Sequence, residues 1–141
     1  MAPDRDYVLC ECSLEALKTF VSDQLLPYYQ VNLTKAPATC LTMVRAEDSV
    51  ENQEFYLGEA LTTECEVEVN GQAGYGICLG DEPDRAYCLA TVDALFAAGD
   101  ARLPTVEAFL AAQWAAIQQR ERLEFSQIMR TKVDFKLMEQ G

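Results

Sequence analysis

The chain has 141 residues, half of them apolar, and its 11 basic and 23 acidic side chains give a net charge of −12. This length predicts a single domain over residues 1–141, large enough to bury a core without disulfide bonds. The negative charge disfavours nucleic acid as a partner, because Lys and Arg contacts to phosphate supply most non-specific affinity. No stretch is as long and apolar as a membrane helix, and the acidic start is unlike a secretory signal. We therefore expect a cytoplasmic protein that does not bind a membrane.

The first third of the chain predicts one helix and two short strands. Apolar residues recur at helical spacing over residues 13–26, and Pro27 ends that helix. Residues 28–35 and 39–46 alternate apolar with polar side chains, which is typical of half-buried strands. The polar stretch 47–54 is predicted to be a loop or wide turn.

Residues 54–80 predict a long antiparallel hairpin that turns at Asn70 and Gly71. A plain two-residue turn would place the glutamates at 64, 66 and 68 on one face with Tyr75. If Gly71 instead forms a bulge, those glutamates lie beside Gly74 and Gly76, and Tyr75 joins the apolar face. A one-residue slip moves every side chain to the other face, so burial favours the bulged register. The glycine face is then either solvated or open to the close approach of another backbone.

The second half of the chain predicts two helices and a terminal arm. Pro83 suits the first position of a helix over 83–98, and Gly99 suits its C-terminal cap. A helix over 105–129 carries an apolar face that is interrupted at 118–122, which indicates either a helix projecting beyond the core or a break. Residues 131–138 alternate like a short strand or arm. The fold class is α+β, an antiparallel sheet with a long central hairpin, packed by three helices.

The residues that carry chemistry do not form a catalytic motif in the sequence. There is no histidine, and the six cysteines lack the two-residue spacing of zinc knuckles, so we expect buried free thiols. A small metal-binding or redox protein that uses these thiols is one alternative. A free-standing enzyme that uses carboxylates such as Glu59, Glu64 or Asp93 is another.

Several short motifs, in a fixed order, link the chain to a known family. They are FYLGE at 55–59, TECEV at 63–67, NG at 70–71, GYG at 74–76, LG at 79–80, VDAL at 92–95, KVDF at 132–135 and Met138. With these motifs the chain resembles the PhnG family, the G subunit of the bacterial carbon–phosphorus lyase system. It departs from the family at the acidic turn 81–85, where many relatives have a basic, histidine-containing turn, and at Lys136 and Leu137.

The resemblance implies an accessory subunit rather than a self-sufficient enzyme. Members of the family act with the H, I and L subunits to replace the adenine of Mg-ATP by methylphosphonate, which gives α-D-ribose 1-methylphosphonate 5-triphosphate. They also belong to a core assembly with the H, I and J subunits, and the iron–sulfur cluster is in J. We therefore expect no catalytic residue, cofactor or metal in this chain, and we expect the I subunit to carry the chemistry.

Partner contacts are predicted on the long last helix, the terminal arm and the central strands. The candidate contact residues are Gly58, Glu59, Gly74, Gly76, Lys132, Asp134 and Phe135. An apolar face made for a partner would also let the isolated chain self-associate.

Overall fold

The computed structural model describes the backbone of residues 4–48 and 53–140, and the side chains of residues 4–43 and 58–129. The helices are α1 (Arg5–Glu11), α2 (Leu14–Phe20), the π-helical turn η1 (Val21–Leu25), α3 (Pro83–Ala98) and α4 (Leu103–Gln140). The strands are β1 (Val31–Asp48), β2 (Gln53–Val69) and β3 (Gln72–Leu79). None of the described helices is long and apolar enough to cross a membrane.

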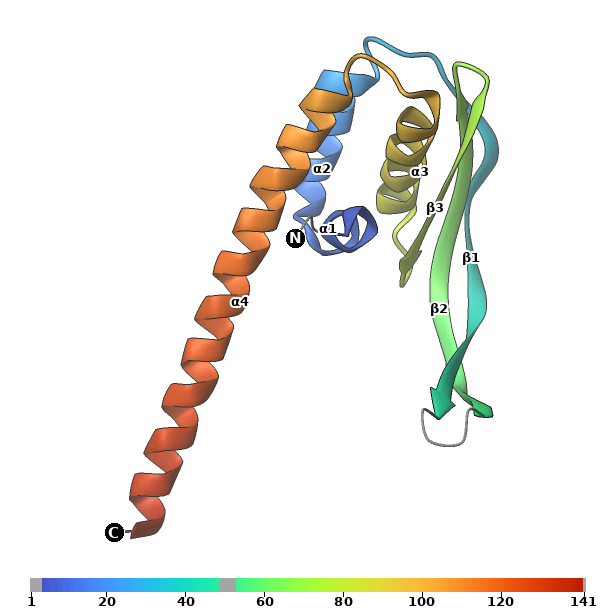
Figure 1. The fold of residues 1–141 in the computed structure, drawn as a ribbon. Coiled ribbons are helices and arrows are strands. Elements are labelled where there is room, and N and C mark those ends of the chain that lie inside the picture. Colours follow the sequence, from blue (N-terminus) through green and yellow to red (C-terminus); the bar gives the residue numbers. More distant parts are fainter. Residues whose placement is uncertain (1–3, 49–52, 141) are drawn as a thin grey trace.

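The three strands form an antiparallel sheet in the order β1-β2-β3, which confirms the α+β class. All helices lie on one side of this sheet (Figure 1). Helix α3 packs directly on β2 and β3, α1 and α2 lie beyond it, and α4 forms the outer layer against α1. Pro83 starts α3, and Gly99 caps it with φ +64°, as the sequence predicts.

The central hairpin takes the plain two-residue turn, so the predicted bulged register is wrong. Val69 pairs with Gln72 and Val67 pairs with Gly74. Asn70 and Gly71 both have positive φ, +51° and +79°, as in the tight turns that join antiparallel strands.

Close packing of α3 explains this register. A Cβ added to Gly74 would lie 2.2 Å from the carbonyl oxygen of Ala90, and one added to Gly76 would lie 2.4 Å from that of Ala86. The glycine face is therefore the buried face, and it shares the core with Cys65, Val67 and Val69. The expectation that Gly74 and Gly76 present an exposed contact surface is wrong, because the backbone that lies against them belongs to α3.

Strand β1 is one continuous strand, although the sequence predicted two strands with a break around Pro37. Proline fits here because β1 lies at the edge of the sheet. Register shifts between Leu33 and Lys35, and again between Lys35 and Ala38, accommodate it. The predicted loop at 47–54 is shorter, since β1 extends to Asp48 and β2 begins at Gln53; residues 49–52 lie outside the described part.

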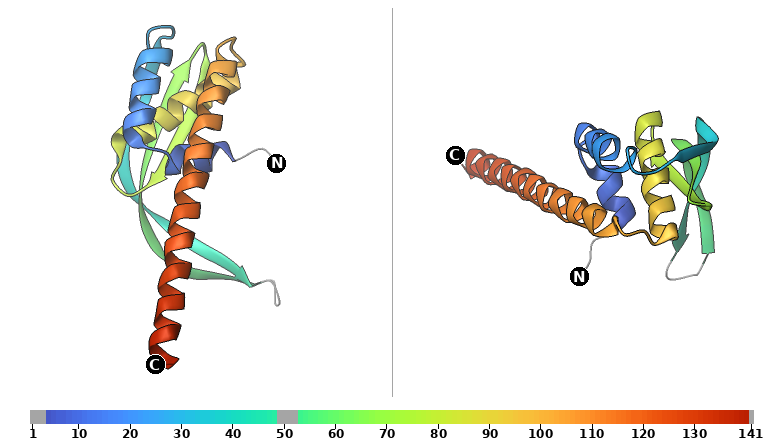
Figure 2. Two further views of the ribbon diagram at one scale, coloured as in Figure 1. Left: turned by 90° about the vertical axis from the view of Figure 1, so that its left-hand side faces the viewer. Right: turned by 90° about the horizontal axis from the view of Figure 1, so that it is seen from above.

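Helix α4 has 38 residues and extends far past the rest of the molecule (Figures 1 and 2). Of the two alternatives for residues 118–122, the projecting helix is confirmed and the break is not. Of the strand or arm predicted at 131–138, the strand is wrong, because the backbone there continues the projecting helix α4.

Candidate interaction surface

Most of the described cysteines are core residues. Cys12, Cys65, Cys78 and Cys88 are buried, Cys10 is half-buried and Cys40 is exposed. Burial raises the pKa of Cys78 to about 11 and that of Cys88 to about 12, so both thiols stay protonated at neutral pH. Within residues 4–43 and 58–129, no three His, Cys, Asp or Glu side chains are grouped so that they could hold a metal.

This burial predicts the pattern of thiol reactivity. In the native protein at pH 8 we expect Cys40 to react with a small disulfide reagent within minutes and Cys10 to react slowly. The other four thiols should react only after unfolding, because the reagent attacks the thiolate and needs access to it. The number of thiols titrated with and without denaturant measures this. Rapid native titration of all six cysteines would show that the helical layers do not cover them.

The three carboxylates of the free-enzyme alternative lie in different places. Glu59 and Glu64 are five positions apart along β2, an odd spacing, and therefore project from opposite faces of the sheet. Asp93 is on α3, where it accepts hydrogen bonds from Arg5 (2.8 Å) and from the backbone N–H of Tyr75 (2.9 Å). Asp93 thus ties α1 and β3 to α3, and these carboxylates do not form an acid–base pair.

Glu64 has structural partners on the outer face of the sheet. Hydrogen bonds from Tyr75 and Lys35 hold the pKa of Glu64 below its usual value. Partial burial and the bond to Glu64 raise the pKa of Tyr75 to about 12. Both groups therefore keep one protonation state across the neutral range.

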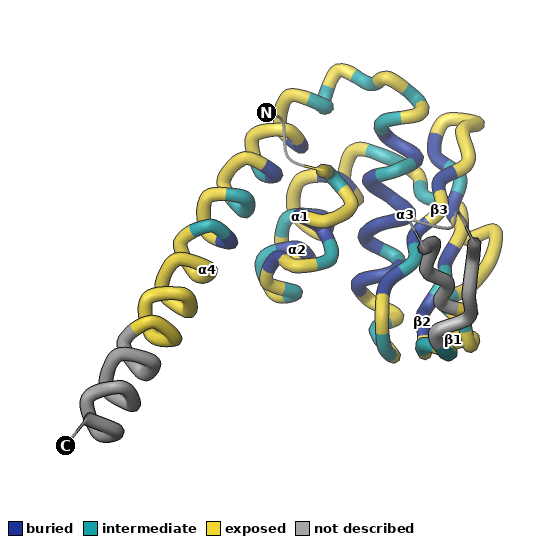
Figure 3. The backbone as a smooth tube through the Cα atoms, turned by 60° about the horizontal axis from the view of Figure 1, so that its bottom comes forward, coloured by how far each residue is buried: buried dark blue, intermediate teal, exposed yellow. Residues whose placement is uncertain are grey.

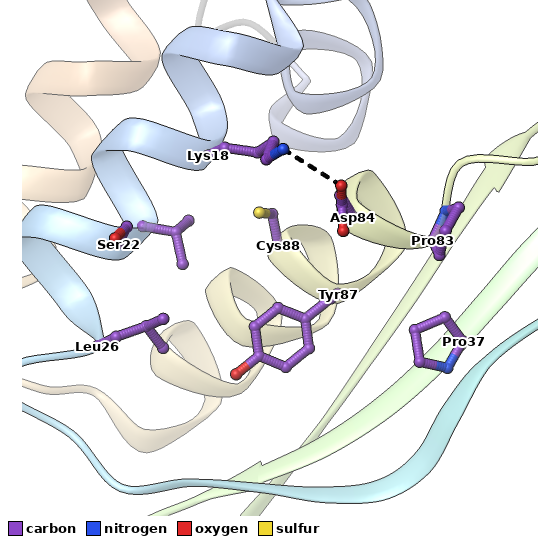
Figure 4. A pocket seen from close by; sticks show the side chains of 9 residues that line it. Lys18, Ser22, Leu26, Pro37, Pro83, Asp84, Tyr87 and Cys88 are labelled. Carbon is purple, nitrogen blue, oxygen red and sulfur yellow. Dashed lines mark ion pairs between the residues drawn. The ribbon is translucent and has the colours of Figure 1, made fainter.

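A cavity of about 270 Å³ lies where α2 and η1 face α3, close to Pro37 of β1 (Figure 4). No pattern in the sequence indicates this cavity. Its walls include Val21, Leu26 and Tyr87, and Lys18 pairs with Asp84 at 3.3 Å beside them. Since these two charges neutralise each other, the cavity offers apolar contact more than a charged binding group.

The projecting half of α4, residues 118–140, is the first of two arms, and we call it the helix arm. Leu110 and Ile117 are buried on the face of α4 that packs against α1. At the same helical spacing, Glu121 accepts a 2.7 Å hydrogen bond from the hydroxyl of Tyr7 on α1. The same stripe then continues to Phe125 and Ile128, which are 65% and 64% exposed. The apolar stripe of α4 is therefore longer than the core that it covers, as the exposed colouring of its outer turns shows (Figure 3).

The second arm, the sheet arm, is the two-stranded part of the sheet beyond the end of β3, residues 41–48 of β1 and 53–61 of β2. Leu41 and Leu61 pair across it and are 66% and 45% exposed. Leu61 is an even number of positions from Cys65 and Val67 along β2, so its side chain lies on the same face of the sheet as theirs. Helix α3 covers that face nearer the hairpin turn, and Leu41, as the partner of Leu61, lies on it too.

The predicted contact residues divide between the arms and the core. Gly58 and Glu59 are in the sheet arm, where Gly58 has a φ of +151° next to a register shift and Glu59 is exposed. Lys132, Asp134 and Phe135 belong to the helix arm, but their side chains lie outside the described part. The exposed leucines were missed because sequence alternation does not show where the covering helix ends.

The family described as phosphonate metabolism protein PhnG matches residues 5–141. The chain belongs to the PhnG family. A PhnG relative from Rhizobium meliloti (strain 1021) is 33% identical over 113 residues, which cover 79% of this chain and 72% of the relative. That relative is named subunit PhnG of alpha-D-ribose 1-methylphosphonate 5-triphosphate synthase.

Proposed function

We propose that this protein is the accessory G subunit of a ribose 1-methylphosphonate 5-triphosphate synthase in phosphonate catabolism. With the H, I and L subunits it would support replacement of the adenine of ATP by methylphosphonate. Family membership and the name of the relative support the synthase, and the exposed stripe of α4 supports the role of a subunit. Since the substrate of the proposed synthase is ATP, we propose that the complex works in the cytoplasm.

The observation that carries this proposal is the continuation of the α4 stripe beyond the core. An isolated helix gains most of its stability from packing of its apolar face. Phe125 and Ile128 extend a packed stripe but contact no layer of the described fold that buries them. Several exposed apolar side chains close together on one helix are typical of interfaces, so we propose that a partner subunit covers them.

The charge of the chain supports a non-catalytic role. Displacing adenine from ATP requires groups that hold a magnesium triphosphate and stabilise positive charge at the ribose. This chain has a net charge of −12, which disfavours binding a triphosphate. The carboxylate of Asp93 already accepts hydrogen bonds from Arg5 and from the backbone of Tyr75. We assign the reaction to the I subunit, with Mg-ATP as substrate of the complex. The core assembly would also contain the H and J subunits, with the iron–sulfur cluster in J.

The test is co-purification of the tagged chain with its cognate I subunit, followed by an adenine-release assay in the presence of the H and L subunits. We expect a stable complex that forms the phosphonate adduct only when this chain is present. Omitting methylphosphonate should give free ribose triphosphate in its place. Turnover of ATP and methylphosphonate by this chain alone, or adduct formation without it, would contradict the accessory role.

A further inference from the structure

The two arms project from the same side of the molecule. In both Figure 1 and the left view of Figure 2, the outer part of α4 and the two-stranded end of the sheet extend downward beyond α1 and α3, and they diverge from each other as they do so. The exposed apolar face of α4 continues the face that packs on α1, and that of the sheet arm continues the face that packs on α3. Since α1 and α3 lie between α4 and the sheet, the exposed apolar faces of the two arms border the space beyond the ends of these two helices.

From this arrangement, and resting on the proposed function, we infer that the arms together clasp one apolar segment of a different synthase subunit. The segment would occupy the space beyond the ends of α1 and α3, which form two successive layers between α4 and the sheet. It would touch Leu41 and Leu61 on one side and Phe125 and Ile128 on the other, and so bury the side chains that the fold leaves exposed.

Charge indicates that the occupant is a different protein and not a second copy. Two copies would bring together chains of net charge −12 each, which repel one another. Within the sheet arm, the exposed Glu59 is next but one to Leu61 along β2, so the two side chains share a face. The sheet arm carries one basic and four acidic residues, so a segment whose apolar side chains are flanked by Lys or Arg on the side of the sheet arm matches that surface. The helix arm has five basic and four acidic residues and contributes apolar contact rather than negative charge.

Paired truncations test whether each arm takes part. We expect Leu41→Ala with Leu61→Ala, and separately Phe125→Ala with Ile128→Ala, to raise the dissociation constant of the complex at least about tenfold. The matched control is Leu79→Ala, since Leu79 is 71% exposed but lies on the opposite face of the sheet. It should change the constant less than about twofold. Because all these side chains are exposed, the Tm of each variant should stay close to that of the unaltered chain.

Photo-crosslinking tests whether both arms hold the same segment. A photoreactive amino acid placed at position 41 or at position 128 of the chain in the complex should capture the same short peptide of one partner subunit. Capture of different subunits, capture of a second copy of this chain, or full binding by the Leu41 and Leu61 double variant would overturn the clasp. Such a result would leave the proposed function intact if the unaltered chain still supports adduct formation. If the unaltered chain binds no synthase subunit, the proposed function and the clasp both fail.

Discussion

Replacing Gly74 by valine is expected to lower the free energy of unfolding by about 3 kcal/mol or more. The first atom of the new side chain would lie 2.2 Å from the carbonyl oxygen of Ala90 and 2.5 Å from the backbone nitrogen of Ala94. Both obstacles are backbone atoms of α3, so no side-chain rotation relieves the overlap and the helix must move off the sheet. Urea unfolding followed by circular dichroism measures the change.

The matched control is Ala73→Val on the same strand. Ala73 is exposed on the opposite face, and valine favours strands, so this variant should stay within about 0.5 kcal/mol of the unaltered chain. Equal stability of the Gly74 and Ala73 variants would mean that α3 does not lie on the glycine face. The bulged register of the hairpin would then be correct.

Replacing Arg85 by methionine is expected to cost about 3 kcal/mol of stability. Its guanidinium is buried and donates to the carbonyl oxygens of Leu9 (2.8 Å) and Cys12 (3.0 Å) at the C-terminal end of α1. It also forms an ion pair with Glu82 at 3.2 Å. Methionine fills similar space but removes the guanidinium donor from both carbonyls, and of the described residues only the thiol of Cys12, at 3.5 Å, still donates to the Leu9 carbonyl. Losing the donor of a buried carbonyl costs about 1–3 kcal/mol.

A second arginine of the chain provides the comparison. Arg120 also binds the end of α1, through the carbonyl oxygen and the carboxylate of Glu11, but its side chain is 48% exposed. Water can replace those contacts, so Arg120→Met should cost less than about 1 kcal/mol. Arg85→Lys should lie between the two, since one ammonium cannot reproduce the fork of the guanidinium. If the two methionine variants were equally stable, α1 would not depend on the buried cap.

The sequence correctly predicts the elements whose ends are marked by residues within the element itself. Pro83 and Gly99 mark both ends of α3, and Asn70 with Gly71 marks the turn of the hairpin. Helix α1 was not predicted, because seven residues make a weak periodic pattern and its C-terminal end is satisfied by Arg85, 73 or more residues away in the sequence.

The errors come from packing between elements. The bulged register was favoured because Tyr75 and its neighbours look like a core face while glycines do not. The contrary signal was present in the small residues Ala86, Ala90 and Ala94, which recur every four residues in α3 and match the glycines of β3. Residues 131–138 have the alternation of a strand but no neighbouring strand with which to pair, and in their absence the backbone continues α4.

The candidate site was only partly predictable for a related reason. The family resemblance indicates a subunit with partners, and the interrupted apolar face of 105–129 indicates a projecting helix. Which apolar residues stay uncovered depends on where α1 and α3 end relative to α4 and the sheet. The positions of these helix ends depend on how the layers stack in three dimensions, and the residue pattern of a single segment does not determine them.

The bond from the Tyr75 N–H to Asp93 also determines how the sheet can grow. Tyr75 lies on β3, which is an edge strand, so this N–H would otherwise be free to receive a strand from another molecule. At the opposite edge, Pro37 has no N–H to offer and the pairing of β1 is irregular around it. Each border of the sheet is therefore interrupted at one point, at Tyr75 on β3 and around Pro37 on β1, and offers a less regular template there for backbone pairing with another chain.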